Sequence, residues 1–179
     1  MRANTPGSRF SVQSEIDRYW AAIDEDLQTV VGGSIPWYRY DSSATQVDSI
    51  YDVGAANGVG RQFKPPVMLK YVGIHLIQGQ TLQSTEGAYN FDMLKLTVNM
   101  PDILRFYPDA QTDEDAFFSD SLQDDLLSDR FIFNGKVFRP IQAQLLGRVA
   151  DRYALLSLSM MEVHDEEMVN DPQFSDYSE

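Results

Sequence analysis

The segment from Phe131 to Gly147, FIFNGKVFRPIQAQLLG, constrains the fold of this chain most strongly. Two runs rich in apolar and β-branched residues flank the dipeptide Asn134-Gly135. Asn-Gly between such runs is the strongest short-range signal for a β-hairpin, because both central positions of a type I′ turn need a positive φ. The sequence therefore predicts two antiparallel strands joined by a two-residue turn at Asn134 and Gly135.

Other segments of the chain also have the composition of strands. They are VMLKYVGIHLIQG (Val67–Gly79), YNFDMLKLTVNM (Tyr89–Met100) and RYALLSLSMMEV (Arg152–Val163). Strands do not alternate with helical segments along the chain, so a parallel sheet is not expected. We therefore expect a mainly β fold, a small antiparallel barrel or sandwich.

One amphipathic helix precedes the strands. Apolar residues recur at spacings of three and four between Val12 and Val31, and Gly32-Gly33 is a strong stop signal. The apolar stripe of this helix can pack on its own domain. Alternatively, Tyr19 and Trp20 on this helix contact a neighbouring subunit, since amphipathic surfaces of this kind also serve as docking faces.

Residues 34–66 mix aromatic residues with Pro, Gly and Ser and have no stable period. Such a long irregular segment is usually functional or disordered, and its aromatic residues argue against plain disorder. We expect an extended arm that orders against a partner chain, with Trp37 and Tyr38 among its contacts. The predicted organisation is thus a helix and arm (1–66), an antiparallel β-domain with an inserted acidic loop or short helix near 109–129 (67–163), and an acidic tail (164–179).

The charge of the chain limits its partners. Its 27 acidic residues exceed its 14 Lys and Arg, which gives a net charge of -13. Such a molecule is repelled by nucleic acid and by anionic membranes. No stretch approaches the roughly 18 apolar residues of a membrane helix, and we expect a soluble, intracellular protein that contacts no membrane. The absence of cysteine excludes disulfides, thiolate zinc sites and thiol nucleophiles.

The residues available for catalysis are few. The chain has two histidines, His75 within an apolar strand segment and His164 at the head of an acidic run, where a solvated tail is far commoner than a cation site. The acidic segment at 109–115 lacks the glycine at the sixth position that a calcium loop needs. Scattered carboxylates, which in principle offer a glycosidase pair, have no spacing that selects two of them: Glu86, Asp92, Asp102 and Asp129. We expect no enzymatic activity, no cofactor and no bound metal.

Two segments carry a resemblance to a known family. The first reads LQDDLLSDRFIFNGKVFRPIQAQLLGRVADRYALLSLSMMEV (Leu122–Val163), and the second reads VDSIYDVGAANGVGRQFKPPVMLKYVGIHL (Val47–Leu76). Together they resemble the head-closure proteins of tailed bacteriophages, also called stoppers or neck proteins. The residues of the second segment that match the family's pattern are Asp48, Ile50, Tyr51, Asp52, Arg61 and Phe63. Of these we take Tyr51, Arg61 and Phe63 as candidate interface residues. The chain departs from the smallest stoppers in its N-terminal helix and its acidic insertion.

The resemblance implies a structural virion protein, assembled in the host cytoplasm and located at the head–tail junction. Such a protein forms a six- or twelve-membered ring of its own copies below the portal and adaptor rings and above a tail terminator or tail tube. Packaged DNA passes through the lumen without tight binding. Two alternatives stay open: another ring protein of the same particle, either an adaptor (favoured by a mainly helical structure) or a tail terminator, and a small β-sandwich enzyme.

Overall fold

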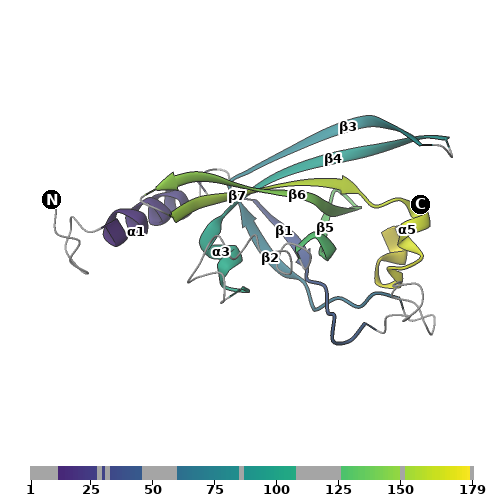
Figure 1. The fold of residues 1–179 in the computed structure, drawn as a ribbon, viewed down its shortest axis with the longest axis horizontal. Coiled ribbons are helices and arrows are strands. Elements are labelled where there is room, and N and C mark those ends of the chain that lie inside the picture. Colours follow the sequence, from purple (N-terminus) through teal and green to yellow (C-terminus); the bar gives the residue numbers. More distant parts are fainter. Residues whose placement is uncertain are drawn as a thin grey trace.

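The antiparallel sheet dominates the fold (Figure 1). The computed structural model describes residues 12–27, 30, 33–45, 60–84, 87–107, 126–149 and 152–177. Within these residues seven strands form one sheet in the order β2-β1-β5-β6-β7-β4-β3, with every neighbouring pair antiparallel. The strands are β1 (Gly33–Tyr38), β2 (Val67–Tyr71), β3 (Gly73–Ser84), β4 (Gly87–Asn99), β5 (Arg130–Phe133), β6 (Lys136–Val149) and β7 (Arg152–Glu162). The predicted mainly β, antiparallel class is confirmed, and the sheet is open rather than closed into a barrel.

The helices lie around this sheet. The predicted N-terminal helix is confirmed as α1 (Val12–Ala22), which continues in a π-helical turn (Ile23–Leu27). Ile16 and Ile23, which belong to the apolar stripe of this segment, are buried. The other helices are short: α3 (Met100–Leu104), α5 (Asp165–Met168) and the 3-10 helix η4 (Pro172–Tyr177).

The sheet folds over itself around the main core. β2 and β3, its two edge strands, follow each other in the chain with only Val72 between them, where sequence reasoning predicted one continuous strand. As a result β1, β2 and β5 form a layer across β4, β6 and β7 (Figure 1). The core between the layers takes alternate residues of these strands and the apolar side of α3: Ile35, Trp37, Leu69, Leu94, Leu96, Val98, Met100, Ile103, Phe131, Phe138, Leu156, Leu158 and Met160. Alternation is expected because successive side chains of a strand point to opposite faces.

The predicted hairpin turn is confirmed. Phe133 of β5 pairs with Lys136 of β6, which leaves Asn134 and Gly135 as a two-residue turn. Their φ angles are 52° and 77°, and Asn134 is the residue other than glycine that has a positive φ in the described part of the chain. Positive φ at both positions is the requirement of a type I′ turn.

The C-terminal segment covers the opposite face of this hairpin. A second apolar cluster there consists of Phe63, Ile132, Val137, Val163, Met168 and Phe174. Phe174 of η4 is 1% exposed and contacts the ring of Tyr38 edge-on, with centroids 4.9 Å apart. We expected a solvated acidic tail over residues 164–179, and the burial of Met168, Asp171 and Phe174 corrects that expectation.

The expected irregular arm is also largely part of the fold. Strand β1 lies inside the sheet between β2 and β5, so the expectation of an arm fails at Gly33–Tyr38. Residues 60–64 return alongside residues 39–41: Tyr40 and Phe63 form an antiparallel bridge, and the Lys64 N–H donates to the Arg39 carbonyl at 2.9 Å. Residues 46–59 lie outside the described residues, so the arm hypothesis remains a prediction only there.

Candidate functional site

The most deeply buried charges join β5 to the C-terminal segment. Arg130 is 1% exposed and Asp171 is 0% exposed. The Arg130 Nε–H donates to Asp171 Oδ2 at 2.8 Å, and the Arg61 Nε–H donates to Asp171 Oδ1 at 2.6 Å. One carboxylate therefore accepts from two guanidinium groups that come from distant parts of the chain.

Glu167 extends this cluster at its more exposed side. Its Oε1 lies 3.4 Å from both Arg61 and Arg130, and its Oε2 lies 3.2 Å from Arg139 Nε, an ion pair without hydrogen-bond geometry. Burial lowers the pKa of Arg130, and the nearby Asp171 carboxylate opposes this shift. Arg130 also donates from its Nη1 to the backbone carbonyls of Ser128 and Asp129. Because Arg130 and the other charges of this cluster bind groups of the same chain, the cluster stabilises the fold.

The backbone before Arg61 fits closely against the C-terminal segment. Gly60 has a φ of 67°, and a Cβ at this position would lie 2.4 Å from Pro172 Cδ and 2.7 Å from the Asn170 carbonyl oxygen. The Arg61 N–H donates to that same Asn170 oxygen at 2.7 Å. Glycine is required here both by the backbone conformation and by the close approach.

A second buried carboxylate, Asp129, lies at the rim of the main core. It is 1% exposed and accepts from the Trp37 indole N–H and the Tyr40 backbone N–H, each at 2.7 Å, and from the Tyr107 hydroxyl at 3.4 Å. Desolvation raises the pKa of Asp129 to about 7, while these hydrogen bonds and Arg39 act in the opposite direction. Although such a pKa suits a general acid or base, Asp129 is enclosed, and neither of the two grooves described below is lined by it.

The larger groove, of about 390 Å³, runs beside the hairpin turn. Lys136 Nζ there lies 3.0 Å from Asp92 Oδ2 and 2.8 Å from Glu162 Oε1. Asp92 also accepts from the Gly79 N–H. This hydrogen bond lowers the pKa of Asp92, and the smaller effect of Lys136 acts in the same direction. The three charges satisfy one another and fix the β3 bulge at Gly79, so they are not poised to transfer protons.

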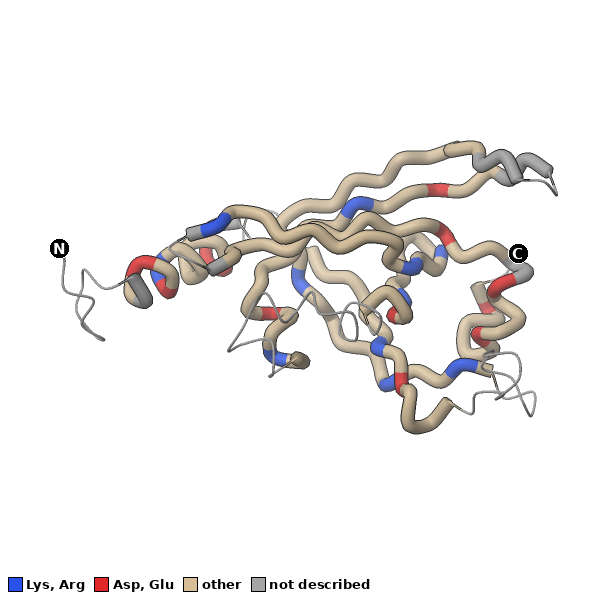
Figure 2. The backbone as a smooth tube through the Cα atoms, in the orientation of Figure 1, with Lys and Arg blue, Asp and Glu red and all other residues tan. Residues whose placement is uncertain are grey.

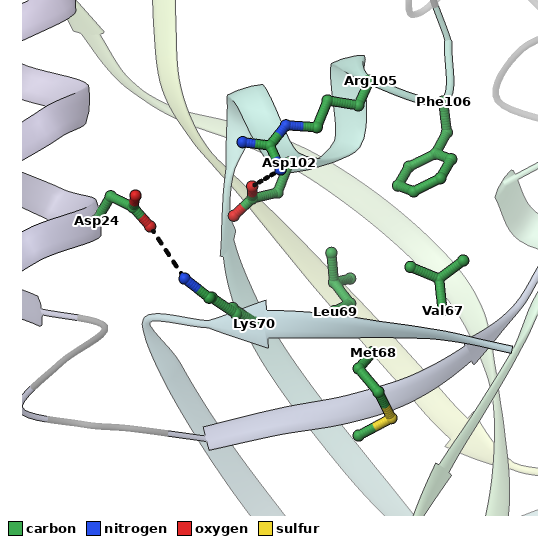
Figure 3. A pocket seen from close by; sticks show the side chains of 8 residues that line it. All are labelled: Asp24, Val67, Met68, Leu69, Lys70, Asp102, Arg105 and Phe106. Atoms are coloured by element: carbon green, nitrogen blue, oxygen red, sulfur yellow. Dashed lines mark ion pairs between the residues drawn. The ribbon is translucent and has the colours of Figure 1, made fainter.

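The smaller groove, of about 140 Å³, lies between α3, β2 and the π-helical turn (Figure 3). Its charged residues form two separate pairs, Lys70 with Asp24 and Arg105 with Asp102, each at 3.5 Å. Lys70 and Asp24 are largely exposed, and exposed pairs of this kind contribute little free energy. This arrangement is typical of surface structure rather than of a catalytic site.

The predicted interface residues have different environments. Tyr19 is 41% exposed and Trp20 is half-buried, so α1 still presents an aromatic side chain to solvent. Trp37 is 0% exposed in the main core, which corrects its assignment to a contact between chains. Tyr38 is half-buried against Phe174, and Tyr51 lies outside the described residues.

The two remaining interface candidates, Arg61 and Phe63, are engaged within the chain. Arg61 binds Asp171, and Phe63 is 8% exposed in the second cluster. Both side chains therefore have partners within the chain, and their contact with a partner chain stays a prediction. Sequence reasoning missed Arg130 and Asp171 altogether. Their only local signal is the position of Arg130 in a strand whose other members are apolar, where a charge needs a buried partner.

The groups considered for chemistry do not converge. Among the residues that the structure describes, no three His, Asp or Glu side chains gather as a metal site would require. Both histidines, His75 and His164, are exposed. The candidate glycosidase carboxylates have unrelated partners: Asp92 binds Lys136, Asp102 binds Arg105 and Asp129 binds Trp37. Glu86 lies outside the described residues.

Comparison of the sequence with models of known protein families gives no match, and no curated protein matches it. In the described part of the chain, none of the helices has the length and apolar character needed to cross a membrane.

Proposed function

We propose that this protein is a structural, ring-forming protein of a tailed-bacteriophage neck, a stopper that closes the filled head and offers the tail a docking face. The proposal starts from the resemblance of two sequence segments to head-closure proteins. Its further support is that these segments, far apart in the chain, meet in one unit. Arg61 and Phe63 of the segment Val47–Leu76 pack on the hairpin of the segment Leu122–Val163, where Arg61 shares Asp171 with Arg130 and Phe63 joins the cluster of Ile132 and Val137.

The open sheet also suits a ring protein. Strand β3 is an edge strand of twelve residues whose only ionisable side chain is His75, and it contains no proline. Soluble proteins usually protect such edges with charges, prolines, bulges or short length, because an unprotected edge pairs with other strands. Of these devices β3 has only the bulge between Ile77 and Gln80. An edge that pairs with a neighbouring subunit serves a ring directly.

The choice among neck proteins rests on the fold class. A mainly helical structure would favour an adaptor ring, and this chain is mainly β. The stopper is therefore our first proposal, and the tail terminator is the remaining alternative within the particle. Under either assignment the partners are the ring above, the tail component below and packaged DNA in the lumen.

The acidic composition fits a lumen that does not hold DNA by affinity. With a net charge of -13 the protein offers few phosphate contacts, and repulsion is screened beyond about 8 Å at physiological salt. We expect no measurable binding to duplex DNA in ordinary salt, by gel shift or anisotropy. Micromolar binding with a steep salt dependence would instead indicate a protein that grips DNA.

The direct test of assembly is electron microscopy of the purified protein. Two-dimensional class averages should show rings with a central hole and six or twelve subunits. A protein that stays monomeric at all accessible concentrations and is also absent from purified particles would contradict the proposal.

A further inference from the structure

The strands β3, β4, β7 and β6 form a sheet with a free edge on each side. On one side β3 is the last strand of the order, so it has a neighbour only in β4. On the other side β5 pairs with β6 only as far as Phe138, and no described strand continues this pairing. The described part of the chain therefore offers two rows of unpaired backbone N–H and C=O groups, which are the groups that bind an added strand.

Each free edge contains a regular segment. We call residues 73–77 the β3 edge and residues 142–146 the β6 edge. The register is unbroken within both segments, because the bulge of β3 lies between Ile77 and Gln80 and that of β6 lies between Pro140 and Gln142. Both edges can thus pair with a strand without interruption.

The charges of the chain favour contact between these two edges. The β3 edge has His75 as its only ionisable residue, and in Figure 2 the described length of β3 shows neither blue nor red. The β6 edge has no ionisable residue, and Arg139 and Arg148 lie outside it. Copies with a net charge of -13 repel one another. Segments without acidic side chains are therefore where two copies meet at the lowest electrostatic cost.

The two edges are also alike in their side chains. On the outer face His75 and Ile77 of the β3 edge and Gln142 and Gln144 of the β6 edge are exposed. On the inner face both edges carry partly buried apolar residues that pack against the main core: Ile74, Leu76, Ala143 and Leu145. A strand added at either edge would cover these apolar side chains further. Joining the two edges would therefore continue the apolar layer from one copy to the next.

The directions of the strands suit pairing between unlike edges. Every neighbouring pair in this sheet is antiparallel, so β3 and β6, which are three pairings apart, run in opposite directions. A rotation about an axis along the strands brings β3 of one copy beside β6 of another in antiparallel orientation. The register also puts both edges at one level, because the row that starts at His75 ends at Gln142.

We propose that the β3 edge of one copy pairs antiparallel with the β6 edge of the next copy, so that their sheets join edge to edge. This inference rests on the proposed ring, for which it names the contact between subunits. The contact is head-to-tail, and head-to-tail contacts generate rings when the rotation closes. Two β3 edges paired with each other would instead form a two-fold contact that ends at a dimer.

Cysteine cross-linking tests this contact, because the chain has no cysteine of its own. His75→Cys places a thiol on the β3 edge, and Gln142→Cys or Gln144→Cys places one on the β6 edge, each at an exposed site. His75→Cys protein, mixed before assembly with either β6 variant and treated with a short bis-maleimide, should shift to a covalent dimer on a denaturing gel. Neither protein alone should give this dimer.

A double variant extends the test from one contact to the whole ring. His75→Cys/Gln142→Cys should give a ladder of covalent products that ends at the size of the closed ring. Within one copy the two positions are three strand spacings apart, about 14 Å, so a short reagent joins them only between copies. Lys64→Cys, exposed and outside both edges, is the matched control and should give no dimer with His75→Cys.

Each other outcome has a defined meaning. Rings formed without a product between β3 and β6, or products equally frequent with Lys64→Cys, would overturn the contact and leave the proposed function standing. A dimer formed by His75→Cys alone would overturn it in favour of a pair of β3 edges. A chain that stays monomeric and is absent from purified particles would overturn both, and a chain that assembles only in particles is cross-linked there. Ile77→Cys, exposed on the same face, replaces His75→Cys if that variant fails to fold.

Discussion

The two faces of the β5–β6 hairpin each bury one carboxylate, and the two carboxylates are stabilised differently. On the core side, Asp129 accepts from an indole, a backbone amide and a hydroxyl, all of them neutral donors. On the outer side, Asp171 accepts from two guanidinium groups. Neutral donors leave the cost of burying charge partly unmet, so the pKa of Asp129 rises, whereas Asp171 has its countercharges in contact. The core side thus carries a carboxyl that titrates near neutrality, and the outer side carries an ionic fastener.

The largest expected effect follows from removing Asp171. Asp171→Ala leaves Arg130, which is 1% exposed, without its carboxylate. Breaking a buried ion pair by removing one partner typically costs about 3–5 kcal/mol. Chemical denaturation should show a loss of this size, while Asp176→Ala, an exposed acid in the same segment, should change the free energy of unfolding by less than about 0.5 kcal/mol. Equal stabilities for the two variants would show that the ion pairs of Asp171 with Arg61 and Arg130 do not stabilise the fold.

The raised pKa of Asp129 predicts that its contribution to stability falls as pH rises, which is the opposite of what an ion-paired acid gives. Its pKa is about 7 in the folded chain against an ordinary value of 3.8, so folding takes up a proton between these values. The stabilising contribution is full below about pH 4 and is lost as pH rises through 7.

The measurement compares the parent with Asp129→Asn, whose side chain does not titrate. The stability of the parent relative to the variant should fall by on the order of 4 kcal/mol between pH 4 and pH 8. The difference between the two cancels the other carboxyl groups, such as Asp92, whose pKa is lowered. A constant difference across this range would show that Asp129 is ionised throughout.

A smaller effect tests how tightly the C-terminal segment packs against Gly60. Gly60 and Gly135 both have positive φ, but only Gly60 lies against another segment, at Pro172 and Asn170. Gly60→Ala should therefore cost more than the roughly 1–2 kcal/mol of the left-handed backbone alone. Increased exposure of Phe174 to limited proteolysis should accompany the loss. A cost no greater than that of Gly135→Ala would mean that the C-terminal segment adjusts freely.

The smallest effect isolates the turn itself. No atom lies within 4 Å of the Cβ position at Gly135, so a substitution there acts through the backbone only. Gly135→Val should destabilise the fold by somewhat more than about 1 kcal/mol, because a β-branched residue resists positive φ. Melting temperatures equal to the parent's would contradict the assigned turn energetics.

Local signals in the sequence predicted the local structure. Asn134-Gly135 specified its turn, and the apolar spacing after Val12 specified a helix, because each signal acts within a few residues. The break at Val72, which separates β2 from β3, has no comparable signal. It depends on the folding of the sheet over the core rather than on the residue itself.

The charge clusters could not be predicted in the same way. Trp37 and Asp129 are 92 positions apart, and Arg61 and Asp171 are 110 positions apart. Acidic residues near the C-terminus indicate a solvated tail unless their partners are known, and aromatic residues next to Pro36 indicate an arm unless the strand pairing is known. Both expectations failed because long-range pairing decides burial.

The central claim is that this chain forms a ring in the neck of a tailed phage, and a localised cryo-EM reconstruction of the head–tail junction tests it most directly. The particle to image is the one whose genome encodes the chain. We expect a ring of six or twelve copies below the portal and adaptor, into which this open sheet fits. A junction whose rings are all accounted for by other chains would contradict it.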